Sequence, residues 1–195
     1  MNPYKTLLKN RSTVAKHFAA NAFNGTTWRI FKAGEEPKIK KFLMREIGDG
    51  RRLARCSKAE YIKRLKGIIE RFRSHFHMSR KMKHQPARFG YAAKVVNLYI
   101  KHLLLIPECL ELRYVRTLET RAHVPLDKLV LARIWGDKRR RGHFRRELSH
   151  LSQQPPTLKA LTSDDYCKIQ SVLADAARKE NIPPVAYDLY YSWRN

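Results

Sequence analysis

The chain has 195 residues, of which 43% are hydrophobic and 10% aromatic. This apolar content suits one compact domain and excludes a chain that is disordered throughout. Lys and Arg number 41 against 17 Asp and Glu, so the net charge is +24. An excess of one sign on this scale indicates a polyanionic partner, with nucleic acid favoured over an anionic membrane surface.

Several other classes of protein are disfavoured by the sequence. No apolar run approaches the roughly 18 residues that a membrane-spanning helix needs, and the first residues lack the apolar core of a secretory signal. Cys56, Cys109 and Cys167 stand far apart, which argues against a disulfide framework and an all-cysteine metal site. We therefore expect a cytoplasmic protein with reduced thiols, no metal and no cofactor, acting as a monomer without membrane contact.

The first half of the chain shows one strong helical pattern. Residues 4–22 and 36–47 have weaker helical periodicity, punctuated by glycines. In segment 57–75, Ser57 and Glu60 form a capping-box sequence ahead of an amphipathic helix. Its predicted apolar face consists of Tyr61, Ile62, Leu65, Ile68, Ile69 and Phe72.

The second half contains further helices separated by basic and polar segments. The basic stretch 78–89 is expected to end in a turn at Phe89–Gly90, followed by a helix over about 91–106 and a less regular stretch over 107–123. Further helices are expected over 128–135, from Thr162–Asp165 onward, and over 184–193. The apolar face expected after Thr162 comprises Tyr166, Ile169, Val172, Leu173 and Ala176.

No segment alternates apolar and polar residues over more than four positions. The sequence therefore predicts an all-α fold, in which two helical lobes surround a cleft.

Two charged residues are candidates for chemistry. Asp127 follows Pro125 and precedes an apolar run, the sequence of a helix N-cap. Lys94 is expected in the first turn of the helix after Gly90, where the helix dipole disfavours a cation and would favour a neutral, nucleophilic amine. Each residue taken alone is better explained as a cap or a solvated surface lysine. Lys101 and Asn97 share the predicted helix face of Lys94.

Gly90-x-x-x-Lys94-Val95 followed by Val124-Pro125-Leu126-Asp127 resembles the helix-hairpin-helix DNA glycosylase superfamily. The Lys–Asp separation and a second lysine, Lys101, are similar to the archaeal 8-oxoguanine glycosylase branch. The chain departs from the family pattern in having one hairpin glycine, which puts the hairpin's phosphate contact in doubt. The resemblance covers about 40 residues. It implies a single domain over 1–195, with 84–136 as the hairpin and catalytic region and with 1–83 and 143–195 completing the lobes.

The resemblance implies that Asp127 stabilises the positively charged sugar as the N-glycosidic bond breaks. Either water or the Lys94 amine would attack the sugar, and the sequence does not choose between them. Double-stranded DNA with a modified base is the expected partner, and the target base must flip out of the stack. Expected DNA contacts are Lys83, Arg88, Gly90, Lys101, Arg139, Arg140 and Arg141, and expected base-pocket residues are Trp28, Asn97, Asp188, Tyr191 and Trp193.

Three functions remain open at the level of sequence. The archaeal branch implies repair of 8-oxoguanine, with possible strand cleavage as a lyase. A related bacterial group defends against phage by removing α-glucosylated hydroxymethylcytosine, and the size and all-helical plan favour this antiviral role. The third is a non-catalytic basic nucleic-acid-binding protein, which explains the charge but gives Lys94 and Asp127 no common purpose.

Overall fold

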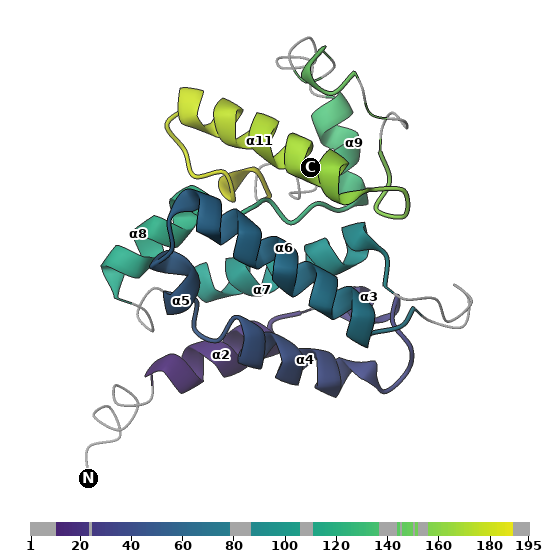
Figure 1. Cartoon of the computed structure of the whole chain (residues 1–195), viewed down its shortest axis with the longest axis vertical. Helices are drawn as coiled ribbons and strands as arrows, with labels where there is room; N and C mark the ends of the chain where they lie inside the picture. Colours follow the sequence, from purple (N-terminus) through teal and green to yellow (C-terminus); the bar gives the residue numbers. More distant parts are fainter. Residues whose placement is uncertain are drawn as a thin grey trace.

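The computed structural model describes residues 11–23, 25–78, 87–105, 111–136, 144, 146–149, 151 and 156–188. Over these ranges the secondary structure is helical apart from an isolated antiparallel bridge between Phe31 and Met78, which confirms the all-α prediction. None of the described helices is long and apolar enough to cross a bilayer. The helices, shown in Figure 1, are α2 (Arg11–Asn21), α3 (Gly25–Trp28), α4 (Glu35–Glu46), α5 (Arg51–Ala54), α6 (Lys58–His75), α7 (Phe89–Leu104), α8 (Leu112–Arg121), α9 (Lys128–Gly136) and α11 (Ser163–Lys179).

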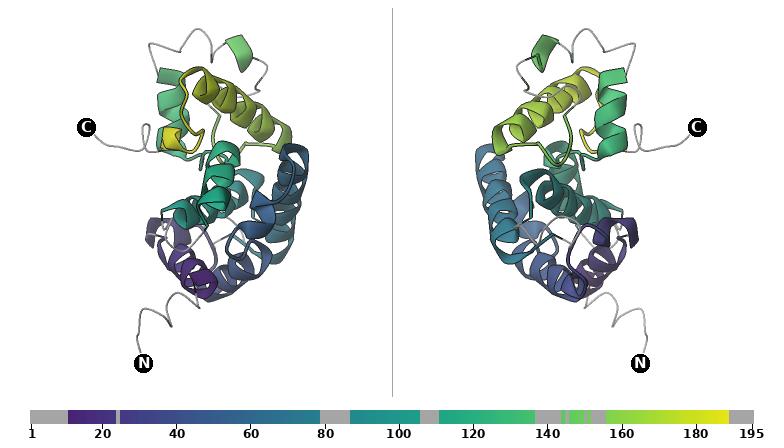
Figure 2. Two further views of the ribbon diagram at one scale, coloured as in Figure 1. Left: turned by 90° about the vertical axis from the view of Figure 1, so that its left-hand side faces the viewer. Right: turned by 90° about the vertical axis from the view of Figure 1, so that its right-hand side faces the viewer.

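Helix α7 lies at the centre of the protein. It contacts α2, α6, α8 and α11, and most of its side chains are buried. A helix that is apolar on nearly all faces must be surrounded by protein, and the sequence of α7 meets that condition. Helices α9 and α11 stand together at one end of the molecule, above the group formed by α2 to α8 (Figures 1 and 2).

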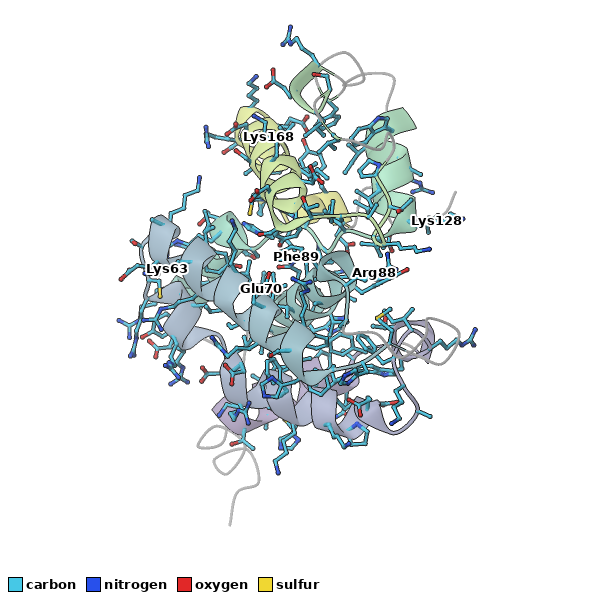
Figure 3. All side chains as sticks on the ribbon, turned by 45° about the vertical axis from the view of Figure 1, so that its right-hand side comes forward. Lys63, Glu70, Arg88, Phe89, Lys128 and Lys168 are labelled. Atoms are coloured by element: carbon cyan, nitrogen blue, oxygen red, sulfur yellow. The ribbon has the colours of Figure 1, made fainter. Side chains whose placement is uncertain are left out.

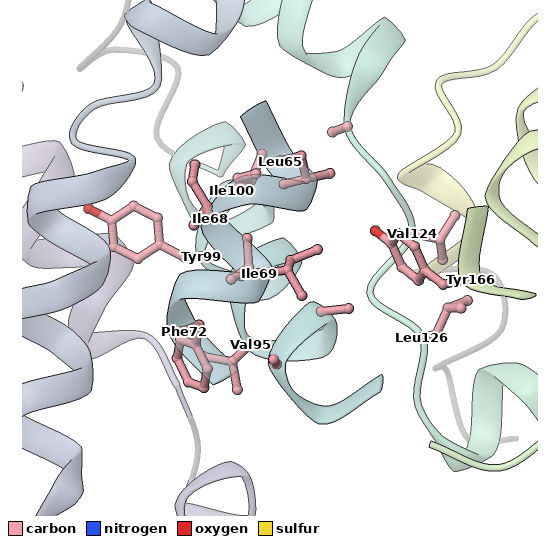
Figure 4. Packing of buried hydrophobic residues seen from close by; sticks show 14 of the residues in the cluster. Leu65, Ile68, Ile69, Phe72, Val95, Tyr99, Ile100, Val124, Leu126 and Tyr166 are labelled. Carbon is pink, nitrogen blue, oxygen red and sulfur yellow. The ribbon is translucent and has the colours of Figure 1, made fainter. Parts of the chain in front are cut away.

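Helix α6 confirms the prediction for segment 57–75. The Ser57 side chain accepts a hydrogen bond from the Glu60 backbone N–H, and the Glu60 carboxylate accepts one from the Ser57 N–H. The predicted apolar face is buried except for Ile62, which is half-buried. Its residues Leu65, Ile68, Ile69 and Phe72 pack against Val95, Tyr99 and Ile100 of α7 (Figure 4).

Helix α11 also matches its prediction. The Thr162 side chain caps the helix by accepting from the Asp165 N–H. All five residues of the expected apolar face are buried. The prediction of a last helix over 184–193 is only partly covered, because the described residues end at 188, where 186–188 are helical.

Two expectations about the middle of the chain were wrong. The stretch 107–123 was expected to be irregular, but Leu112–Arg121 form α8. Its buried residues Tyr114, Val115 and Leu118 recur at helical spacing, so the amphipathic pattern was present but spans only a short helix without a side-chain cap.

The expected turn at Phe89–Gly90 is also absent, because α7 begins at Phe89 and Gly90 is its second residue. Gly90 is buried against the chain at Leu158, and an added Cβ would lie 2.4 Å from the Leu158 carbonyl oxygen. Glycine is therefore required at this position by the close approach of another backbone, rather than by a turn. Gly90, which the resemblance placed among the DNA contacts, is a buried residue in the structure.

Two alanine substitutions should distinguish a glycine that close packing requires from one that it does not. Gly90→Ala should lower the free energy of unfolding by about 1–3 kcal/mol, because the Leu158 backbone must move to admit the methyl group. Gly67→Ala, in the middle of α6, should raise it by up to about 1 kcal/mol, because a Cβ there meets only the flexible tip of Arg71 at 3.3 Å. Urea denaturation of both variants measures the difference. Equal effects of the two substitutions would contradict this packing.

Candidate active site

The extended segment 122–127 carries Asp127 from the end of α8 to the start of α9. At its centre the Val124 N–H donates to the Gln170 side-chain oxygen at 2.9 Å, and the Gln170 amide donates to the Val124 carbonyl at 2.8 Å. Both residues are buried, so these bonds satisfy groups that would otherwise lose their hydration. Helix α11 thereby fixes the position of the segment that leads to Asp127.

Asp127 has the capping role that the sequence predicted. Its Oδ1 accepts a hydrogen bond from the Val130 N–H at 2.8 Å, which caps the start of α9. Its second oxygen, Oδ2, lies 3.9 Å from the Nζ atom of Lys94. The Lys94 and Asp127 side chains are 21% and 26% exposed, so both are accessible from solvent. One carboxylate oxygen is therefore structural, and the other faces an amine.

The argument from the helix dipole does not hold for Lys94. Because α7 begins at Phe89, Lys94 is the sixth residue of the helix and not part of its first turn. The dipole acts strongly only within the first turn. The chemistry of Lys94 therefore depends on its neighbours across the cleft rather than on the helix end.

Lys94 and Asp127 line one cleft of about 400 Å³, formed by the start of α7, by α9 and by residues 156–159. Its walls are mostly apolar, and Leu129 remains 40% exposed there. A mostly apolar cleft with a few charged groups is the usual form of a ligand site. The apolar walls are formed by Tyr91, Leu129, Leu131, Ala132, Pro156 and Leu158.

A second ion pair lies close to the first. The Nζ of Lys101 donates to Asp188, whose side chain is almost fully buried. Burial raises the pKa of the Asp188 carboxyl, and the hydrogen bond from Lys101 offsets part of this rise. The charges of Asp127 and Lys94 also act on Asp188, so the four groups form one electrostatic cluster. Lys101 had been expected to contact DNA, and in the structure its amine is paired with Asp188 and its side chain is mostly buried.

Three expected base-pocket residues, Trp28, Asn97 and the ion-paired Asp188, do not line the cleft. Asn97 is buried, and its side chain donates to the Ala93 carbonyl and to the Tyr166 hydroxyl, both at 2.7 Å. Trp28 lies on α3, where its ring is 4.9 Å from that of Phe23. Residue spacing predicts on which side of α7 Asn97 lies, but not which neighbouring element covers that side. Asn97 was therefore expected in the base pocket although Tyr166 covers it.

Arg88 lies just before α7 and donates to the Lys159 carbonyl at 3.1 Å, which ties the helix to the loop beside the cleft. Arg88 and Lys128 lie on the same side of the molecule in Figure 3. The other expected contacts fall outside the described residues, namely Lys83, Arg139, Arg140, Arg141, Tyr191 and Trp193.

Sequence reasoning missed three residues of the cleft, Tyr91, Lys128 and Lys159. Lys128 and Lys159 are exposed, and neither makes an ion pair with a carboxylate within the described ranges. Lys128 directly follows Asp127 in the sequence, so its position beside the cleft could have been predicted. Lys159 is brought there only by tertiary packing.

A chain of polar groups lies behind the segment 122–127. The Tyr166 hydroxyl accepts from Asn97 and lies 2.7 Å from Nδ1 of His123. Because the Tyr166 hydroxyl already accepts from Asn97, its own proton can point toward Nδ1 of His123. That hydrogen bond requires Nδ1 to be unprotonated. Burial lowers the pKa of His123 to about 4, in agreement with a neutral ring. His123 also lines a separate cavity of about 410 Å³ with Tyr61 and Arg121.

Among the described residues, no three His, Cys, Asp or Glu side chains gather as a metal site would require. Comparisons with protein-family models, with curated proteins and with solved structures give no match for this chain. The class defined by the structure is therefore an all-helical protein with a Lys–Asp pair in an apolar cleft.

The neutral His123 predicts how stability depends on pH. The folded state holds the pKa of His123 at about 4, below its usual value of about 6.5. The contribution of the neutral ring to the free energy of unfolding is therefore complete above pH 6.5 and is lost as the pH falls toward 4. The loss should be about 1–3 kcal/mol. Denaturation of the wild type and of His123→Gln across this window should show a steeper decline for the wild type. Parallel curves would contradict a neutral buried ring.

Proposed function

We propose that this protein is a DNA glycosylase that removes a modified base from double-stranded DNA. The observation that carries the proposal is the placement of the Lys94 amine and the Asp127 carboxylate 3.9 Å apart in one accessible cleft. These residues come from separate helices and are 33 positions apart in the chain.

The chemistry follows from the charges that develop on the sugar. When the bond between C1′ and the base nitrogen breaks, the base leaves with the electron pair and the sugar becomes positively charged. The free Oδ2 of Asp127 would stabilise this charge, because its Oδ1 is already fixed by Val130. Attack at C1′ by the Lys94 amine would form a C–N bond as the bond to the base breaks, and the attached amine would then give up a proton. Breakage of the C1′–O4′ bond would open the ring and give a Schiff base with a free 4′-hydroxyl. Attack by water would leave a plain abasic site.

The surroundings of the pair suit a nucleic-acid substrate. Lys128 and Lys159 stand at the cleft, where they can contact phosphates on either side of an extruded nucleotide. Tyr91 and the exposed Leu129 offer apolar surface to a base or sugar. The net charge of +24 supplies the long-range attraction for the DNA backbone.

The substrate class that we favour is glucosylated hydroxymethylcytosine in phage DNA, with 8-oxoguanine as the second candidate. A cleft of about 400 Å³ falls within the range of ordinary ligand sites and has room for a base with a bulky substituent. An antiviral role follows from this substrate, because unmodified host DNA would not be attacked.

The experiment is to incubate the protein with glucosylated phage DNA, with 8-oxoguanine duplex and with unmodified DNA, and to count abasic sites. Asp127→Asn should reduce base release by about 100-fold or more, because the charge is lost while the cap is kept. Borohydride should trap a covalent adduct with the wild type and not with Lys94→Gln. Base release without any adduct would assign the attack to water.

Asp164→Asn is the matched control, because Asp164 is an exposed acid in the first turn of α11. It should release bases at the wild-type rate. Should none of the three DNAs lose a base, the protein would be a non-catalytic DNA-binding protein instead. Should Asp127→Asn release bases at the wild-type rate, Asp127 would not carry the chemistry and the proposed site would be wrong.

A further inference from the structure

A basic groove lies on α4, α5 and α6, away from the cleft. It measures about 660 Å³, and its lining includes five cations and two carboxylates. Lys63, on α6, and Lys128, beside the cleft, stand at opposite margins of the molecule in Figure 3. Figure 2 likewise shows α6 and α9 on opposite sides. The cations of the groove are Arg45, Arg52, Lys63, Arg64 and Arg71.

The carboxylates of the groove are already engaged. Glu46 accepts hydrogen bonds from Arg71 and Arg45, and the pKa of its carboxyl is lowered mainly by these two arginines against the effect of burial. Glu60 belongs to the capping box of α6. Arg52 and Lys63 make no ion pair with any carboxylate in the part of the chain that the structure describes. The groove therefore keeps a net positive charge.

The spacing of the cations matches an extended anion rather than a single phosphate. Arg64 and Arg71 are seven residues apart and share one face of α6, and Lys63 lines the same groove from the neighbouring face. At 1.5 Å per residue the stretch from Lys63 to Arg71 runs about 12 Å along the helix, which is enough for two consecutive phosphates of a strand. Gly67 stands between Arg64 and Arg71 and leaves the floor of the groove without a side chain.

We propose that this groove binds the phosphate backbone of a second DNA duplex, so that one protein molecule can hold two DNA segments at once. A straight duplex in the Lys94–Asp127 cleft cannot also occupy a groove on the opposite side of the protein. The contacts would be to phosphates alone, and they would therefore be independent of sequence and base modification. The inference rests on the proposed function for the first duplex, which occupies the cleft, but it does not require base removal because it concerns unmodified DNA.

The test is a capture assay with two unmodified duplexes, one fixed to beads and one fluorescent, at about 0.1 M salt. The wild type should retain the fluorescent duplex. Arg52→Ala/Lys63→Ala should reduce capture by about fivefold or more and lower the salt dependence of capture by about two counterions. Gly67→Glu should also reduce capture, because it places a carboxylate on the groove floor without removing a cation.

The matched control is Arg116→Ala/Lys168→Ala, which removes two exposed cations outside the groove. It should keep capture within about twofold of the wild type, because only distant charge is lost. Equal losses in the groove and control variants would show that net charge alone is responsible and would overturn the proposal. Failure of the wild type to capture a second duplex would overturn it as well, whatever the result of the base-release assay.

Discussion

The position of the candidate site depends on how the segment 122–127 is held. This segment is extended and four of its six residues are buried, so its backbone groups need partners, and no strand among the described residues supplies them. The side chain of Gln170 provides both a donor and an acceptor to Val124, at 2.8 and 2.9 Å. Replacing it with an apolar residue would leave two buried backbone groups unsatisfied. A single amide on α11 therefore determines where Asp127 enters α9.

The second constraint is electrostatic. In a protein with 41 basic and 17 acidic residues, two carboxylates and two amines gather in one cluster. The inner pair, Lys101 and Asp188, is mostly buried, so removing either partner would leave an uncompensated charge. The outer pair, Lys94 and Asp127, is accessible at the cleft. The outer pair is therefore the one that remains available to a ligand.

Local signals in the sequence were sufficient for the strongest helices. Ser57 and Glu60 marked the start of α6, and Thr162 marked the start of α11, because capping depends only on neighbouring residues. The cap at Asp127 was predictable for the same reason. Helix α8 was missed although its apolar residues Val115 and Leu118 recur at helical spacing, because the helix is short and carries no capping motif.

Long-range contacts were not predictable from spacing. Gly90 looked like a turn residue, but it is needed because the backbone of Leu158 passes against it. Lys101 was expected to contact DNA, and its partner in the structure, Asp188, is 87 residues away. Lys159 reaches the cleft through a loop with no motif of its own. The resemblance nevertheless paired Lys94 with Asp127, and the structure places these two side chains together.

The most direct measurement of this pairing is zero-length cross-linking with a carbodiimide, which joins an amine to a carboxylate in contact. Peptide mass spectrometry should recover a link between Lys94 and Asp127, and Asp127→Asn should abolish it. The link between Lys40 and Glu36, whose charged atoms are 2.7 Å apart, is the internal control. Recovery of the control link with no link between Lys94 and Asp127 would contradict the shared site.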